Sequence, residues 1–195
     1  KRRTYAARVP PEQRRTQLLD AALHLVVTRG HNAATMHAVA EQIGVTKPVI
    51  YGQFGGRAEL LNALLRREQE QALAQLAAIW PNDQSFAHPS EVLPSLLSCF
   101  LDAVRDAPDR WTCIVMPMPD MPAEFHAARE QARATVLAAA CELARRLGSS
   151  GPLDPEIVGH AIVALFEMAA RLVLTDPDHF DPARFVAAAR AAFAV

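Results

Sequence analysis

Residues 46–53 bring hydrogen-bonding groups and small apolar groups together in one short segment. Within it, Ile50 lies one helical turn before Phe54, so both are expected to face a core. The side chains left to point outward are Thr46, Lys47, Pro48, Val49, Tyr51 and Gln53. A lysine can donate to guanine O6 or N7, a glutamine can pair with adenine, and a proline or valine can touch a thymine methyl group. This mixture favours contact with base edges in the major groove of DNA.

Hydroxyl and guanidinium groups in and around this segment suit phosphate oxygens instead. Thr35, Thr46, Tyr51 and Arg57 carry such groups. Contacts of this kind fix the register of a protein on DNA without reading its sequence. Two helix N-termini would add free N–H groups and partial positive charge toward the same backbone. Taken singly, each of these residues is also compatible with an ordinary core or surface position.

The charge of the chain is divided between its two ends. Residues 1–67 hold eleven Lys and Arg against four Asp and Glu, whereas residues 68–195 hold nine against seventeen. The net charge of −1 therefore hides a first third at +7 and a remainder at −8. A basic segment joined to an acidic body indicates a polyanionic partner at one end only. Chance variation in surface charge is the alternative.

Three helices are predicted to position the polar segment. The first covers residues 11–29 and ends at a glycine, which can take the left-handed conformation beyond it. Thr35 can cap a short second helix, whose inner face would be Met36, Val39, Ala40 and Ile43. Gly44 ends that helix, and Thr46 can cap the third. Two short helices joined by a glycine turn are the layout of a helix-turn-helix.

The same segment resembles the signature of the TetR family of transcription regulators. The match covers about residues 12–62, and the residues that carry it are Thr35, Val39-Ala40, Gly44-Val45-Thr46-Lys47-Pro48-Val49-Ile50-Tyr51, Phe54 and Arg57-Ala58-Glu59-Leu60. The family usually has His where Gln53 stands, Lys where Arg57 stands, and a Ser or Asn cap where this chain has Gly55-Gly56. The cap of the following helix is therefore expected to be weakened.

Helical periodicity continues to the end of the chain, and no alternating strand pattern is found. Further helices are expected at residues 57–79, 90–106, 108–115, 122–147, 155–174 and from about 182 to near 195. Two of these helices have the same start signal, an aspartate cap followed by proline, at Asp154 and Asp181. The fold class is thus predicted to be all-α, with about nine helices.

The resemblance implies two domains and a homodimer. Residues 1–56 would form the helix-turn-helix DNA-binding domain, and residues 57–195 a helical ligand-binding and dimerisation domain, with helix 57–79 as linker. In this family the last two long helices of the body usually form the dimer interface, which implies helices near 122–147 and 155–174. A dimer presents two recognition helices about 34 to 36 Å apart, so the DNA operator should be near-palindromic.

A cluster rich in aromatic residues and methionine is the candidate effector site. It comprises Phe100, Trp111, Met116, Met118, Met121, Phe125 and Phe166, with His126 and His160 as polar groups beside it. Adaptable methionines next to aromatic rings suit a small apolar or aromatic effector. Ordinary core packing is the alternative for each of these residues.

The sequence disfavours several other classes of protein. It has no nucleophile motif, phosphate loop, paired carboxylates or metal-ligand spacing, so we expect no enzyme, no cofactor and no metal site. The three cysteines have no paired spacing and are expected to be buried apolar residues. No apolar run is expected to be long enough for a membrane span, and no apolar signal segment follows the basic start. A cytoplasmic protein without a membrane partner is therefore expected.

These features together predict a DNA-binding transcription regulator. Its simplest form is a ligand-responsive repressor that is released from its operator by a small effector. The alternative is a helical small-molecule-binding protein or enzyme without a DNA role, and an architectural DNA binder without a ligand is a further one. Replacing Lys47 and Tyr51 by alanine separates these alternatives, since only a regulator would lose operator binding and keep its ligand.

Overall fold

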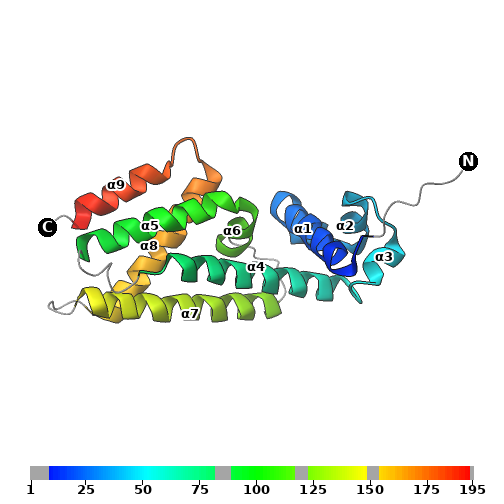
Figure 1. Cartoon of the computed structure of the whole chain (residues 1–195), viewed down its shortest axis with the longest axis horizontal. Coiled ribbons are helices and arrows are strands. Elements are labelled where there is room, and N and C mark those ends of the chain that lie inside the picture. The colour runs from blue at the N-terminus through cyan, green and yellow to red at the C-terminus, as the bar shows by residue number, and fades with distance from the viewer. Residues whose placement is uncertain (1–8, 82–88, 117–122, 149–153, 194–195) are drawn as a thin grey trace, which may run out of the picture. The chain divides into compact units, whose positions relative to one another are not determined.

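The computed structural model describes residues 9–81, 89–116, 123–148 and 154–193, which form nine α-helices, one 3-10 helix and no strand (Figure 1). The predicted all-α class and the number of helices are confirmed. In chain order the helices are α1 (Pro11–Arg29), η1 (His31–Ala33), α2 (Met36–Gln42), α3 (Lys47–Tyr51), α4 (Arg57–Ile79), α5 (Pro89–Asp106), α6 (Pro108–Val115), α7 (Ala123–Leu147), α8 (Pro155–Thr175) and α9 (Pro182–Phe193). The described residues divide into two compact units, and the division falls within α4, between Arg67 and Glu68. The domain boundary expected before Arg57 stays a prediction.

The first unit is built on the apolar side of α1. The buried residues of α1 are Leu18, Leu19, Ala21, Ala22, Leu25 and Val26, which follow the spacing of one helix face. In α2, Met36, Val39 and Ala40 are buried as predicted, whereas Ile43 is only half-buried because it already lies past the end of the helix. Gly44 then turns the chain with a φ of +67°, a conformation that costs glycine nothing.

The two short helices of this unit are capped differently. The Thr35 side chain accepts a hydrogen bond from the backbone N–H of Ala38 at 3.1 Å, as predicted for the start of α2. Thr46 occupies the same position before α3, but its side chain makes no such bond. The prediction that Thr46 caps α3 through its hydroxyl was therefore wrong. A helix of five residues is too short to be stable alone. Burial of Ile50 and Phe54, which are 0% and 1% exposed, holds α3 in place.

The second unit has an aromatic core between α5, α6 and α8. The Phe100 ring lies 5.0 Å from that of Trp111 in an edge-on arrangement and 5.3 Å from that of Phe166. The predicted starts of two further helices are confirmed. Asp154 Oδ1 accepts from the N–H of Glu156 at 2.9 Å before α8, and Asp181 has the equivalent bond before α9.

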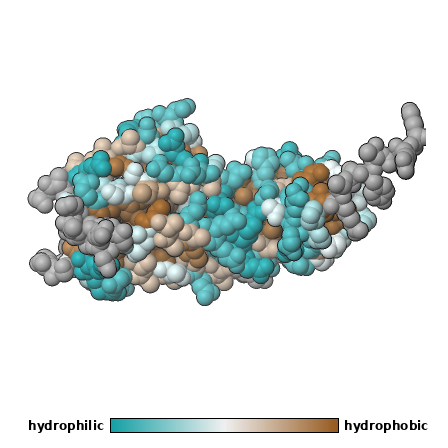
Figure 2. Space-filling view, in the orientation of Figure 1, coloured by the Kyte–Doolittle hydropathy of each residue, from teal (hydrophilic) through white to brown (hydrophobic). Residues whose placement is uncertain are grey.

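Helix α8 is more apolar than expected. It is long and apolar enough to cross a membrane by length and composition, with a mean hydropathy of 1.8 over its best window and a third of that window buried. The expectation that no segment reaches this length was therefore wrong. The reason is that both of its faces are apolar: one packs in the core, and the other exposes Ile157, Leu165 and Met168, by 66%, 36% and 41%. Hydrophobic residues also reach the surface of the second unit in the view of Figure 2.

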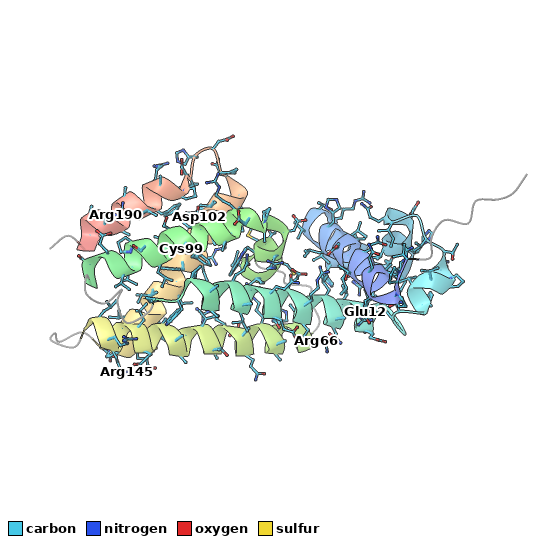
Figure 3. All side chains as sticks on the ribbon, in the orientation of Figure 1. Glu12, Arg66, Cys99, Asp102, Arg145 and Arg190 are labelled. Carbon is cyan, nitrogen blue, oxygen red and sulfur yellow. The ribbon has the colours of Figure 1, made fainter. Side chains whose placement is uncertain are left out.

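The cysteines do not share one environment. Cys113 is buried in α6, where burial and the nearby carboxylate of Glu68 raise its pKa from 9.0 to about 11. Cys141 is half-buried, but Cys99 is exposed on α5 (Figure 3). The expectation that all three are buried was therefore wrong for Cys99, which lies on the solvent side of an amphipathic helix.

Candidate nucleic-acid interface

The α3 region presents one polar face opposite its buried side. The side chains of Thr46, Lys47, Pro48, Val49 and Tyr51 are exposed, Tyr51 by 54%, and that of Gln53 is half-buried. Ile50 and Phe54 face the other way, into the core of the first unit. The sequence thus placed these side chains on the correct sides, and their contact with DNA stays a prediction.

An arginine of α1 fixes the C-terminal end of α3. Arg15 Nη1 donates a hydrogen bond to the carbonyl oxygen of Gln53 at 2.8 Å. Its guanidinium carbon also lies 4.2 Å from the centre of the Phe54 ring, within the range of a cation–π interaction. Sequence reasoning missed this residue. The sequence shows that this segment is basic, but it gives no local pattern that connects Arg15 to a residue 38 positions later.

Arg57 is bound inside the first unit. Its Nε donates to the carbonyl oxygen of Ala34 at 3.1 Å, and its Nη2 donates to that of His31 at 2.7 Å. These two carbonyls belong to the turn that leads to Thr35, so Arg57 joins the start of α4 to the start of α2. The sequence assigned this side chain to DNA phosphate, and that assignment stays a prediction, which the geometry does not favour.

The glycine pair before α4 is compensated by a glutamate. Glu59 Oε2 accepts a hydrogen bond from the backbone N–H of Gly55 at 2.7 Å, two residues before the first residue of α4. A Cβ atom at Gly55 would lie 3.1 Å from this oxygen, whereas one at Gly56 would meet nothing within 4 Å. Glu59 thus holds the glycine turn before α4, and position 56 could accept a larger residue.

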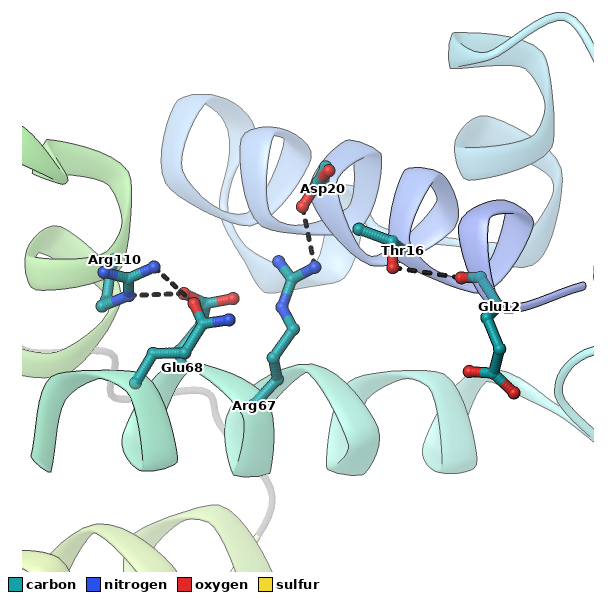
Figure 4. A network of polar contacts seen from close by, with 7 residues as sticks. Glu12, Thr16, Asp20, Arg67, Glu68 and Arg110 are labelled. Carbon is teal, nitrogen blue, oxygen red and sulfur yellow. Dashed lines mark hydrogen bonds and ion pairs between the residues drawn. The ribbon is translucent and has the colours of Figure 1, made fainter. Parts of the chain in front are cut away.

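Two further arginines are paired with carboxylates (Figure 4). Arg67 forms an ion pair with Asp20 of α1 at 2.7 Å, within the first unit. In the second unit, Arg110 of α6 forms an ion pair with Glu68 of α4 at 3.1 Å, and Glu68 is only 1% exposed. Arg110 also donates to the side-chain oxygens of Gln71 and Gln75, so one guanidinium contacts successive turns of α4.

The residues proposed to bind an effector are only partly brought together. Phe100, Trp111 and Phe166 lie in one cluster, and Met116 packs against it. The methionines at positions 118 and 121 and the side chain of Phe125 lie outside the described residues. His126 and His160 are exposed on α7 and α8. Binding of an effector at this cluster stays a prediction.

Comparison with known proteins identifies the first unit. Residues 18–64 match the model of the bacterial regulatory proteins of the tetR family, and this range contains α2, α3 and the start of α4. This segment is similar to the DNA-binding segment of TetR-family regulators. A relative, the HTH-type transcriptional activator FasR of Mycolicibacterium smegmatis, is 47% identical over 60 residues, which cover 31% of this chain and 27% of FasR. The match therefore spans about a quarter of that relative's length.

Solved structures extend the likeness to the second unit, at the level of fold. A TetR-like transcriptional regulator from Rhodococcus sp. RHA1 has a TM-score of 0.77 at 24% identity and covers 95% of this chain and 96% of its own. The regulator FadR from Bacillus subtilis, solved in complex with stearoyl-CoA, has a TM-score of 0.69 at 14% identity, with coverages of 91% and 96%. Named relatives are thus regulators rather than enzymes.

Proposed function

We propose that this protein is a DNA-binding transcription regulator of the TetR family that places α3 in the major groove. The observation that carries the proposal is that α3 exposes Lys47, Val49 and Tyr51, whereas Ile50 of α3 and Phe54 just beyond its end are buried. A side chain can read base edges only if it is exposed and its backbone is held rigidly. The contacts of Arg15 and Arg57 supply that rigidity.

We further propose that the protein binds a near-palindromic operator as a homodimer through α7 and α8. Besides its three exposed large apolar residues, α8 exposes Ala161 and Ala164, and α7 exposes Ala127, Ala134 and Ala138. Exposed apolar side chains that gather on a surface indicate an interaction site. In a two-fold dimer the same face meets itself, which suits a face made of small and apolar residues.

The dimer is tested by placing a charge on that face. Met168→Glu should convert the dimer to a monomer, because two carboxylates would be buried against each other across the two-fold axis. Ala188→Glu, at an exposed position of α9, is the matched control and should leave the dimer intact. The molar mass is measured by size-exclusion chromatography with light scattering. Equal masses for both variants would contradict the proposed interface.

The proposed regulator responds to a small apolar or aromatic effector that binds in the second unit. The B. subtilis FadR structure holds stearoyl-CoA, which supports small-molecule binding by a protein of this fold. The contacts of Arg110 with Glu68, Gln71 and Gln75 connect α6 to α4. We propose that the effector favours an arrangement of α6 and α4 in which the two recognition helices no longer match the half-site spacing.

The DNA-binding role is tested by selecting bound duplexes from a random library and measuring their affinity by fluorescence anisotropy. Lys47→Ala with Tyr51→Ala should abolish sequence-specific binding and leave the fold and the mass of the dimer unchanged. Arg66→Ala, which removes an exposed cation of α4 (Figure 3), is the control for charge alone. If the dimer neutralises about eight phosphates, log K should fall with log salt at a slope near −7. Equal loss in both variants, or no salt dependence, would contradict the proposal.

The direction of regulation needs a separate test. We propose that this protein is a repressor. Its relative FasR is named an activator, so its relatives include a protein that regulates in the opposite direction. A reporter gene placed behind the selected operator should be silenced by the protein and released by the effector. Increased expression in the presence of the protein would make it an activator. A cytoplasmic location is proposed because the partner is DNA.

A further inference from the structure

The indole N–H of Trp111 is a buried donor without an acceptor. The side chain is 3% exposed, and Nε1 has no hydrogen-bond partner among the described residues. Leaving a buried donor unpaired costs about 1–3 kcal/mol, so most buried polar groups in proteins have a partner. Phenylalanine would fill a similar apolar site without that cost. The indole therefore points to an acceptor that no described residue provides.

Trp111 belongs to a hydrophobic cluster of the second unit. The buried members of this cluster are Ala72, Leu97, Phe100, Leu101, Val104, Trp111, Val115, Ala169, Ala170, Val173 and Ala189. The partly buried residues against it are also apolar, Met116 and Phe166 among them. An apolar cage with one unpartnered donor suits a ligand that is largely apolar and carries one acceptor.

The nearby charges favour a neutral acceptor over a carboxylate. The preceding residue, Arg110, is already paired with the buried carboxylate of Glu68. Arg129 donates to the carbonyl oxygen of Met116 at 3.0 Å. Arg110 is therefore already neutralised, and an anionic group that enters the apolar cluster would lose its hydration, which is unfavourable. Ketones, esters and aromatic ring nitrogens accept hydrogen bonds without carrying charge.

We propose that Trp111 is the polar recognition residue of the effector site, and that the effector is a neutral, mainly apolar molecule whose single acceptor receives the indole N–H. Its apolar part packs against Phe100, Phe166 and Met116. This inference rests on the proposed effector response and narrows its chemistry, since a pure hydrocarbon of the same shape would leave the donor unpaired.

The test uses two probes of equal shape, quinoline and naphthalene, which differ by one ring nitrogen. Binding to the full chain is followed by NMR of ¹⁵N-labelled tryptophan, and Trp80→Phe assigns the two indole signals. Quinoline should bind at least tenfold more tightly than naphthalene and move the Trp111 indole proton downfield. In Trp111→Phe this preference should fall below twofold, and in Phe166→Leu, which keeps the donor, it should persist.

Several results would overturn the proposal. These are equal affinities for the two probes, binding of neither, or a preference that survives in Trp111→Phe. An indole proton shifted upfield and unchanged by quinoline would show that the donor faces the Phe100 ring instead. The outcome is separable from the DNA-binding proposal, because the preference for quinoline is measured on the protein without DNA. A protein that shows the quinoline preference but binds no operator would refute only the DNA-binding role.

Discussion

Replacement of Arg57 by methionine separates two roles for this residue. If Arg57 neutralises DNA phosphate, its loss weakens binding through charge. If it acts through His31 and Ala34, its loss loosens the turn that precedes α2, and thereby the helix-turn-helix formed by α2 and α3. Methionine retains most of the side-chain length and removes both the charge and the donors, so the two roles predict different measurements.

The effect on stability follows from the two hydrogen bonds. A bond from a charged donor contributes about 1.5–3 kcal/mol when buried, and the half-buried position of Arg57 argues for about 1 kcal/mol each. Arg57→Met should therefore lower the free energy of unfolding by about 2 kcal/mol, which for a chain of this size shifts Tm by roughly 4–8 °C. Arg57→Lys, with a compact ammonium group that can reach one carbonyl, should lose about half as much.

The salt dependence of DNA binding gives the second measurement. Each phosphate contact contributes about 0.9 to the slope of log K against log salt, and a dimer carries each substitution twice. A phosphate-binding Arg57 would thus reduce the slope by about 1.8 in the methionine variant. We expect no change in slope and a severalfold loss of affinity. Lys47→Met, which removes an exposed cation at the start of α3, should lower the slope by about 1–2 and leave Tm unchanged.

The two readouts together decide the question. Affinity is measured by fluorescence anisotropy at several salt concentrations on the selected operator, and Tm by circular dichroism at fixed protein concentration. A slope reduced by nearly two units in Arg57→Met, with Tm unaltered, would refute the positioning role. It would show that the carbonyl contacts of Arg57 give way to phosphate when DNA binds.

Three other predictions concern packing, capping and thiol chemistry. Gly159→Ala should destabilise the protein by about 1–2 kcal/mol in denaturant unfolding, because the new Cβ would lie 2.6–3.0 Å from the Sγ, N and Cα atoms of Cys141. This overlap outweighs the better helix propensity of alanine. An unchanged stability would contradict the close approach of Gly159 to Cys141. Gly56→Ser should instead stabilise it by a few tenths of a kcal/mol, since the position is open and serine can cap α4, and a loss of stability would show that the cap bond does not form. A thiol reagent should label Cys99 in the native protein and Cys113 only after unfolding. Because the pKa of Cys113 is raised to about 11, stability should fall as pH rises from about 9 to 11, and Cys113→Ala should remove that part of the fall.

The elements of the fold could be predicted because their signals are local. Helix α1 ends at a glycine with φ of +80°, and Asp154 and Asp181 cap helices that begin with proline; each signal depends on residues within one or two turns. The membrane-length hydropathy of α8 depends on length and composition, but it was missed because His160, Glu167 and Arg171 interrupt the apolar run, so that only the mean over a window shows it.

The partners of the basic residues could not be predicted, because helical period gives the face of a side chain and not its contact. Arg15 and Arg57 were counted with the positive charge available to DNA, yet their donors are directed to carbonyl oxygens 38, 26 and 23 residues away. Arg67 is neutralised by Asp20. The net charge of the first third therefore overstates the number of cationic side chains that are available to contact DNA. Recognition depends instead on the few exposed side chains of α3, which those internal arginines hold in position.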